Sequence, residues 1–214
     1  MSFLIRVEQV SHAFHGVRVL QDISVSFEKG KIHGIVGNNG SGKTLLFKVI
    51  CGYLKPHQGT VWIAGKQLGK AFDFPPSLGM ILETPGFLFA HSAHQNLELL
   101  WALRGKPDRA AIQETLNRVG LQAVGNKKVG KFSLGMRQRL GIAQAIMESP
   151  ELLILDEPFN GLDKQGVRDI RDLLREQRQR GATILLASHI SADIEELCDT
   201  VHEMDAGRIQ RVTG

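Results

Sequence analysis

The chain has 214 residues, of which 43% are hydrophobic and 22% charged, so it is long enough for one α/β domain with a sizeable core. Its formal net charge of +4 is too small to indicate a nucleic-acid partner, and a solvated basic face accounts for it better. The two cysteines, Cys51 and Cys198, stand far apart among apolar neighbours, which favours buried free thiols and a reducing compartment.

The N-terminal part of the chain alternates in the manner of a β-strand. Ile23, Val25 and Phe27 are apolar and are separated by serines, which predicts a strand with one buried face. A turn follows at residues 29–30, and the apolar residues 32–36 then predict a strand that leads into the next segment.

The eight residues after that strand match the phosphate-binding pattern G-x-x-x-x-G-K-[ST] without a mismatch. They are Gly37, Asn38, Asn39, Gly40, Ser41, Gly42, Lys43 and Thr44. Residues 45–50 predict the helix that leads out of the loop, and its N-terminus and the loop amides would bind phosphates. Lys43 would reach the β- and γ-phosphates, and Thr44 would offer its hydroxyl to Mg²⁺. The alternative is a glycine-rich turn with a chance lysine, but strand, loop and helix together favour a nucleoside triphosphate site.

The middle of the chain changes from strand to helix periodicity. Residues 60–63 and 78–82 predict two further short strands. From about residue 92 to 148 the apolar residues recur at helical spacing, and Pro107-Asp108 gives a start signal for a second helix. The pattern therefore predicts a helical insertion within an α/β chain.

Two acidic residues follow the fully apolar run 152–155, which is typical of a parallel strand covered on both faces. Asp156 stands at the carboxyl end of this strand, where α/β sheets bind ligands, and is expected to hold Mg²⁺ directly or through water. Glu157 is expected to polarise a water for attack on the γ-phosphate. A solvated acidic pair at a strand end is the alternative interpretation, and the phosphate-binding loop in the same chain makes it the weaker one.

The last part returns to alternating helices and strands. A charged helix around residues 168–180 is expected to face water, a strand is expected at 183–187, a short helix at 192–198, and a hairpin turn at 206–207. His189 follows the strand and would lie one strand away from the acids. It could be a structural histidine, or it could donate a hydrogen bond to the γ-phosphate.

Taken together, these motifs resemble the nucleotide-binding subunit of ATP-binding cassette (ABC) transporters over nearly all of the chain. The resemblance implies that Phe14 stacks on adenine, although an aromatic in a strand core is the alternative. It implies that Asp163 communicates between two active sites and that His189 is the switch histidine. It also implies that Ser133 and Gly135 contact the γ-phosphate bound to the opposite subunit.

Two segments depart from the usual family pattern. The signature L-S-G-G-Q is replaced by Phe132-Ser133-Leu134-Gly135-Met136, and glutamate stands at position 83 where the family normally has glutamine. Glu83 can still bind Mg²⁺, but it brings negative charge towards a phosphate. The pair of variant segments resembles the subgroup that exports bacitracin, lantibiotics and related peptide antibiotics.

We therefore predict an ABC-type P-loop ATPase with a mainly parallel sheet. Residues 1–85 and 150–214 would form the core and a small antiparallel β portion, and residues 86–149 a helical subdomain. The expected nucleotide-binding residues are Phe14, Gly37, Asn38, Asn39, Gly40, Ser41, Gly42, Lys43, Thr44, Leu45, Ser133 and Gly135. The expected metal ligands are Thr44, Asp156 and Glu83, and the expected catalytic residues are Glu157, His189 and Lys43.

The resemblance implies ATP and Mg²⁺ as ligands, a homodimer that sandwiches ATP, and separate integral membrane permease subunits. The N-terminus shows no leader pattern and no run of about 18 apolar residues occurs, so we expect a cytoplasmic chain held at the inner face of the membrane. One alternative is a soluble ABC ATPase that moves no solute, but such proteins usually carry two cassettes or a long coiled coil. The other is a regulatory subunit whose hydrolysis is impaired by Leu134 and Glu83.

Overall fold

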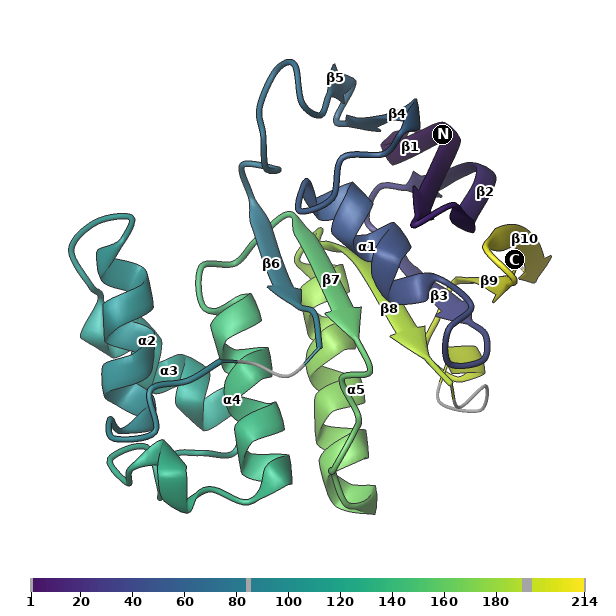
Figure 1. The fold of residues 1–214 in the computed structure, drawn as a ribbon. Helices are drawn as coiled ribbons and strands as arrows, with labels where there is room; N and C mark the ends of the chain where they lie inside the picture. The colour runs from purple at the N-terminus through teal and green to yellow at the C-terminus, as the bar shows by residue number, and fades with distance from the viewer. Residues whose placement is uncertain (1, 84–85, 190–193, 214) are drawn as a thin grey trace.

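A six-stranded sheet forms the centre of the computed structural model, which describes residues 2–83, 86–189 and 194–213 (Figure 1). The strand order is β10-β9-β3-β8-β7-β6; β10 is antiparallel to β9 and the other neighbours are parallel. The strands are β3 (Ile32–Val36), β6 (Leu78–Ile81), β7 (Leu152–Asp156), β8 (Thr183–Ser188), β9 (Thr200–Asp205) and β10 (Arg208–Thr213).

A smaller antiparallel sheet packs over one face of the central sheet. Its order is β2-β1-β4-β5, built from β1 (Phe3–Phe14), β2 (Val17–Glu28), β4 (Gln58–Ile63) and β5 (Lys66–Gln67). Ile23 and Phe27 are buried, as the alternation predicted for β2. They share a core with helix α1 (Lys43–Cys51) and with one face of the central sheet.

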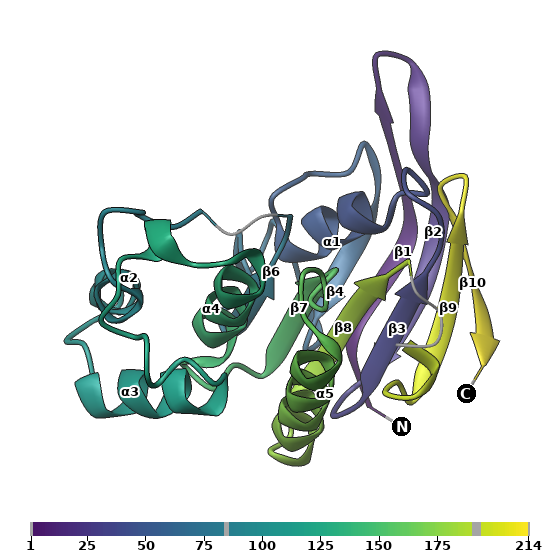
Figure 2. The ribbon, with the colours of Figure 1, turned by 90° about the horizontal axis from the view of Figure 1, so that it is seen from below.

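Strand β7 shows why the central strands are apolar throughout. Leu152 and Ile154 belong to the core under α1, whereas Leu153 and Leu155 belong to the core on the opposite face. Helix α5 (Lys164–Gln179) covers that opposite face (Figure 2). Because successive side chains of a strand point to opposite faces, a strand covered on both faces needs apolar residues at every position.

The helical portion lies between β6 and β7 in the sequence and at the β6 edge of the sheet (Figure 1). It contains α2 (Ala93–Ala102), α3 (Arg109–Arg118), the short 3-10 turn η1 (Val129–Lys131) and α4 (Leu134–Ile146). Ser92 and Gln95 form a capping box on α2, and Asp108 caps α3, as the Pro107-Asp108 signal predicted. The helical insertion is thus confirmed; the division at residues 85–86 and 149–150 stays a prediction.

Three further details bear on the sequence prediction. Helix α1 extends over Lys43–Cys51, slightly beyond the predicted 45–50, and ends there because Gly52 adopts a left-handed φ of 87°. Part of the helix expected at 192–198 lies outside the described residues, and Leu197 N and Cys198 N both donate to Ile194 O. Within the described part of the chain, no helix is long and apolar enough to cross a membrane.

Both cysteines are free thiols, as the sequence predicted. Burial raises the pKa of Cys51 to about 12. Burial, helped by the charge of Asp199, raises the pKa of Cys198 to about 12 as well. Because the reactive form of cysteine is the thiolate, these two residues act as small apolar side chains.

Candidate nucleotide-binding site

The phosphate-binding loop joins β3 to α1, and glycine is required in it for two physical reasons. Gly42 caps α1 with a left-handed φ of 110°, which a residue with a side chain rarely adopts. At Gly37, an added Cβ would lie 2.1 Å from the carbonyl oxygen of Met204 in the neighbouring strand β9. The loop therefore packs against the sheet with its backbone, which leaves backbone N–H groups and the N-terminus of α1 for an anion.

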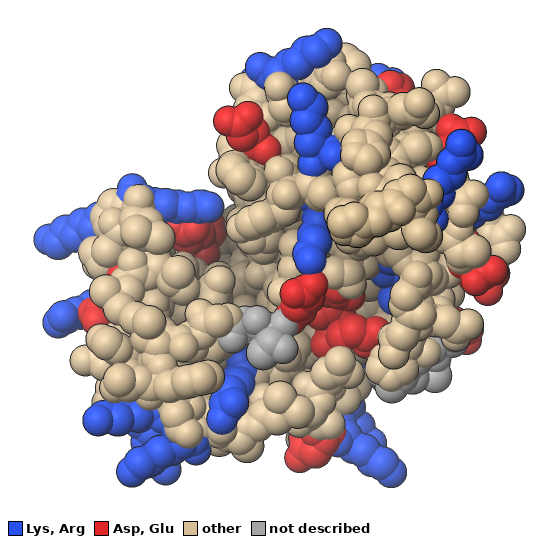
Figure 3. Space-filling model, viewed as in Figure 1, with Lys and Arg blue, Asp and Glu red and all other residues tan. Residues whose placement is uncertain are grey.

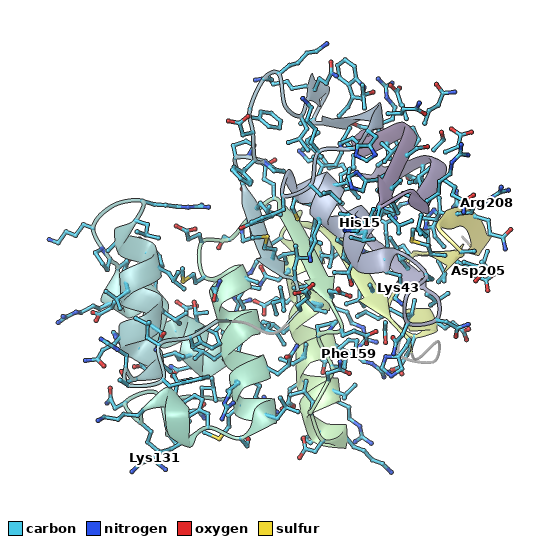
Figure 4. The ribbon with its side chains drawn as sticks, in the orientation of Figure 1. His15, Lys43, Lys131, Phe159, Asp205 and Arg208 are labelled. Carbon is cyan, nitrogen blue, oxygen red and sulfur yellow. The ribbon has the colours of Figure 1, made fainter. Side chains whose placement is uncertain are left out.

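Two polar side chains of the loop are arranged for phosphate binding. Lys43 lies at the start of α1 (Figure 4), and its Nζ donates to the carbonyl oxygens of Gly37 and Asn38 at 2.6 and 3.1 Å. The hydroxyl of Ser41 is buried and has no hydrogen-bond partner among the described residues. A phosphate chain in the loop would supply acceptors for both groups, so the loop fits a nucleoside triphosphate.

Thr44 and Asp156 form the candidate metal site. The Thr44 hydroxyl donates to the Asp156 carboxylate, which lies at the end of β7. Burial raises the pKa of Asp156, and the charges of Glu157 and Glu83 add to the rise against the Thr44 hydrogen bond and Lys43. A cation bound beside Asp156 would stabilise the charged form of its carboxylate. The described residues hold no group of three or more His, Cys, Asp or Glu that could bind a metal ion. Mg²⁺ commonly takes its other ligands from water and substrate phosphates.

Glu157 and His189 come together at the adjoining strand ends. His189 Nδ1 lies 2.9 Å from Glu157 Oε2, and a carboxylate acceptor requires that Nδ1 carries the proton. The contact follows from topology, since β7 and β8 are parallel neighbours whose carboxyl ends share one edge. Glu157 has a left-handed φ of 50°, an uncommon backbone conformation for a non-glycine residue. The sequence prediction that His189 lies beside the acids is confirmed, and its contact with a γ-phosphate stays a prediction.

A cavity of about 510 Å³ joins Lys43, Thr44, Asp156 and Glu157, and His189 is not among the residues that line it. It is lined by residues of the phosphate loop, the ends of β6 and β7 and the start of α4: Asn39, Gly40, Gly42, Lys43, Thr44, Leu45, Glu83, Leu134, Arg137, Gln138, Asp156, Glu157 and Asn160. Acidic side chains gather in the hollow between the helical portion and the sheet, next to a basic side chain (Figure 3). The structure therefore brings most of the predicted loop, metal and catalytic residues to one place.

Sequence reasoning did not assign Arg137, Gln138 and Asn160 to this cavity. Gln138 Nε2 donates to the Glu157 carbonyl oxygen at 3.3 Å, so it ties α4 to the acidic strand end. Arg137 and Gln138 directly follow the signature segment, and Asn160 stands three residues before Asp163, so their position beside residues of the family pattern was the available signal.

Phe14, Ser133 and Gly135 are not among the residues that line the cavity. Phe14 ends β1 with 43% of its surface exposed, and its ring meets the edge of His12 at a centroid distance of 4.7 Å. Its stacking on adenine stays a prediction. Ser133 caps α4, because its Oγ accepts from Met136 N at 3.2 Å.

The variant signature packs on the loop that follows Glu157. A Cβ added at Gly135 would lie 2.6 Å from the Gly161 carbonyl oxygen, and one added at Gly161 would lie 2.6 Å from Leu134 Cγ. Leu134 is 61% exposed and lines the nucleotide cavity. Asp163, at the end of the same loop, caps α5 by accepting from Gly166 N at 2.7 Å.

Glu83 lies just beyond β6 and reaches both the cavity and the helix behind it. Its carboxylate lies 2.7 Å from Lys48 Nζ in α1. It also has a left-handed φ of 59°, like Glu157. As a metal ligand it stays a prediction, since its present partner is a lysine.

The fold and the site define a P-loop nucleoside triphosphatase. The ABC transporter family model matches residues 20–160. The uncharacterized ABC transporter ATP-binding protein YybJ of Bacillus subtilis is 43% identical over 207 residues, which cover 97% of this chain and 95% of YybJ.

Two further relatives carry names for transported compounds. The bacitracin transport ATP-binding protein BcrA of Enterococcus faecalis is 38% identical over 211 residues, an alignment that covers 98% of this chain and 68% of BcrA. The lantibiotic transport ATP-binding protein SrtF of Streptococcus pyogenes is 32% identical, and the alignment covers 96% of this chain and 89% of SrtF. A solved ATP-binding subunit of an ABC transporter superposes with a TM-score of 0.87 at 29% identity, over 98% of this chain and 90% of that one. This chain belongs to the ABC transporter family, as an ATP-binding subunit with ATPase activity.

Proposed function

We propose that two copies of this chain sandwich MgATP and drive export of a peptide antibiotic through separate membrane permease subunits. The observation that carries the proposal is the meeting of Lys43, Thr44, Asp156 and Glu157 in one cavity, with His189 hydrogen-bonded to Glu157. The family supplies ATP as the nucleotide. The named relatives that act on bacitracin and lantibiotics support a peptide antibiotic as the transported compound.

In the proposed reaction, the Glu157 carboxylate orients a water molecule and accepts its proton as the water oxygen bonds to the γ-phosphorus. The bond to the bridging oxygen breaks, and ADP and phosphate leave. Lys43 would exchange its bonds to the loop carbonyls for the β- and γ-phosphate oxygens. Thr44 and Asp156 would hold Mg²⁺, which would neutralise charge on those oxygens. His189 would hold the Glu157 carboxylate in place and would contact the γ-phosphate.

The position of the signature segment supports the proposed dimer. Ser133 lies exposed at the N-terminus of α4, a helix of 13 residues whose first N–H groups suit an anion. In a head-to-tail pair, Ser133 and Gly135 of one copy would face the γ-phosphate held by Lys43 of the other. ATP binding would close the pair and hydrolysis would open it, which converts nucleotide turnover into movement.

The permease would dock beside Glu83, at the inner face of the membrane. A second cavity of about 280 Å³ lies there, between α1, the end of β6 and α4, and Tyr53 on its rim is 59% exposed. Because Glu83 lines both cavities, movement of a docked partner would reach the nucleotide directly.

The test is the variant Glu157→Gln, which keeps the shape of the side chain and removes the base. We expect it to bind ATP with parent affinity, to lose nearly all phosphate release, and to accumulate as a dimer with MgATP in size-exclusion chromatography. Glu203→Gln, an exposed change on β9, is the matched control and should leave all three properties at the parent level. Hydrolysis by Glu157→Gln at the parent rate would refute the assignment of the base. A parent protein that binds ATP but releases no phosphate with its permease present would favour a regulatory subunit.

A further inference from the structure

The glutamate at position 83 adds a negative charge to the nucleotide cavity that a glutamine would not add. Three carboxylates, those of Glu83, Asp156 and Glu157, line the cavity that is to receive a triphosphate. The charge of Glu83 is felt at the metal site, since it contributes to the raised pKa of Asp156. An additional negative charge there opposes the binding of the nucleotide anion and favours the binding of a cation.

Lys48 is placed to offset that charge. It lies on α1 four residues after Thr44, so the two side chains share one face of the helix, one turn apart. Its Nζ lies 2.7 Å from Glu83 Oε1, with 33% of the lysine side chain and 64% of the glutamate side chain exposed. Lys48 does not line the nucleotide cavity, but it lines the second cavity together with Glu83. The ion pair thus stands at the wall between the two cavities.

The Glu83 carboxylate thus has two possible partners that compete for it, Lys48 and a metal ion in the nucleotide cavity. Glu83 has a left-handed φ of 59° and lines the same cavity as Thr44 and Asp156. When it is paired with Lys48, its charge is offset and metal-free nucleotide meets less repulsion. When it turns to the metal, Lys48 loses its partner.

We propose that Lys48 is a positioning residue that competes with Mg²⁺ for the Glu83 carboxylate, so that the lysine favours binding of metal-free ATP and weakens binding of the metal. The inference rests on the proposed nucleotide site and adds to it a residue outside the phosphate-binding loop.

The change Lys48→Met keeps the aliphatic stem and removes the charge. We expect metal-free ATP, measured by calorimetry in EDTA, to bind about three- to tenfold more weakly, as for one uncompensated charge at partly screened range. The Mg²⁺ concentration that half-saturates the protein–ATP complex should fall by about the same factor. Lys48→Arg should stay within about twofold of the parent in both measurements, because it keeps the ion pair.

Glu83→Gln is the complementary change, and it should tighten metal-free ATP binding while raising the Mg²⁺ requirement. In the Glu83→Gln background, Lys48→Met should have a clearly smaller effect, because only the direct charge of the lysine is then lost and no carboxylate is left for it to hold. Lys31→Met is the matched control: Lys31 also pairs with a glutamate, Glu28, at 2.7 Å, at the start of β3, and it lines neither cavity. It should bind ATP and Mg²⁺ as the parent does.

Equal effects of Lys48→Met with and without Glu83 would overturn the proposal, as would parent-like binding by Lys48→Met or Glu83→Gln. These outcomes leave the nucleotide site intact as long as the parent binds ATP. A parent protein that binds ATP neither in EDTA nor in Mg²⁺ would instead refute the proposed function, and this inference with it.

Discussion

Acidification should destabilise this protein through a buried histidine in β9, the strand beside the phosphate loop. His202 on β9 is buried against the edge of Phe27, at a ring-centroid distance of 5.3 Å. Its Nδ1 has no hydrogen-bond partner among the described residues. Burial, with the nearby charges of His33 and Arg211, lowers its pKa from 6.5 to about 4, against a backbone hydrogen bond at Gly34 that raises it.

The sign and size of the effect follow from that shift in pKa. Between the two values the unfolded chain binds a proton that the folded protein does not, so the free energy of unfolding falls as the pH falls. Stability is fully present above the unfolded value of 6.5. For one such histidine the loss is about 2 kcal/mol between pH 7.5 and pH 5, and about 3 kcal/mol once the pH is below the folded value. Burial also lowers the pKa of His33, which adds a loss of the same sign.

The assay is urea unfolding at a series of pH values, for the parent and for His202→Leu. Leucine replaces a ring that has an unpaired buried nitrogen, so we expect similar stability at about pH 7.5 and a variant about 2 kcal/mol more stable than the parent at about pH 5. His15→Asn is the control, because His15 is exposed at the β1–β2 turn and asparagine tolerates its left-handed φ of 48°. Parallel pH curves for the parent and His202→Leu would refute the reasoning.

Three predictions concern the nucleotide site. Lys43→Ala should weaken ATP binding by at least about tenfold, as loss of a charge-assisted bond implies, and unchanged affinity in calorimetry would remove the phosphate-loop argument. Phe14→Ala should weaken ATP binding about five- to hundredfold but leave tripolyphosphate binding unchanged, with Phe14→Tyr as control; equal losses for both ligands would contradict adenine stacking. Ser133→Ala should lower the free energy of unfolding by about 1 kcal/mol through loss of the α4 cap and should reduce the MgATP dimer of Glu157→Gln, whereas an unaffected dimer would argue against the proposed contact.

The parts of the fold that the sequence predicted are those encoded by neighbouring residues. Three local patterns each predicted one structure: the all-apolar run of β7, the capping residue Asp108 and the eight residues of the phosphate loop. The meeting of Glu157 and His189 was also predictable, because parallel neighbouring strands end at one edge. These inferences needed no knowledge of how distant segments pack.

What the sequence did not predict depends on contacts between distant segments. Lys48 and Glu83 are 35 residues apart, and their pairing is set by how α1 lies against the end of β6. Gln138 enters the cavity because α4 docks on the acidic strand end. The buried pair His33 and His202 requires the parallel alignment of β3 and β9. Glu83 and Gln138 stand at or beside family motifs, but no local pattern marks Lys48, His33 or His202, since lysine and histidine are ordinary on exposed surfaces.

The way the helical portion is attached limits how it can move. The chain leaves the sheet at the end of β6 and returns at the start of β7, and these strands are parallel neighbours. The two attachment points therefore lie at opposite ends of the edge, about one strand length of 13 Å apart. A rigid body attached at two separated points rotates most easily about the line through those points and resists rotation about other axes. The helices should thus swing about an axis along the sheet edge, towards and away from the triphosphate.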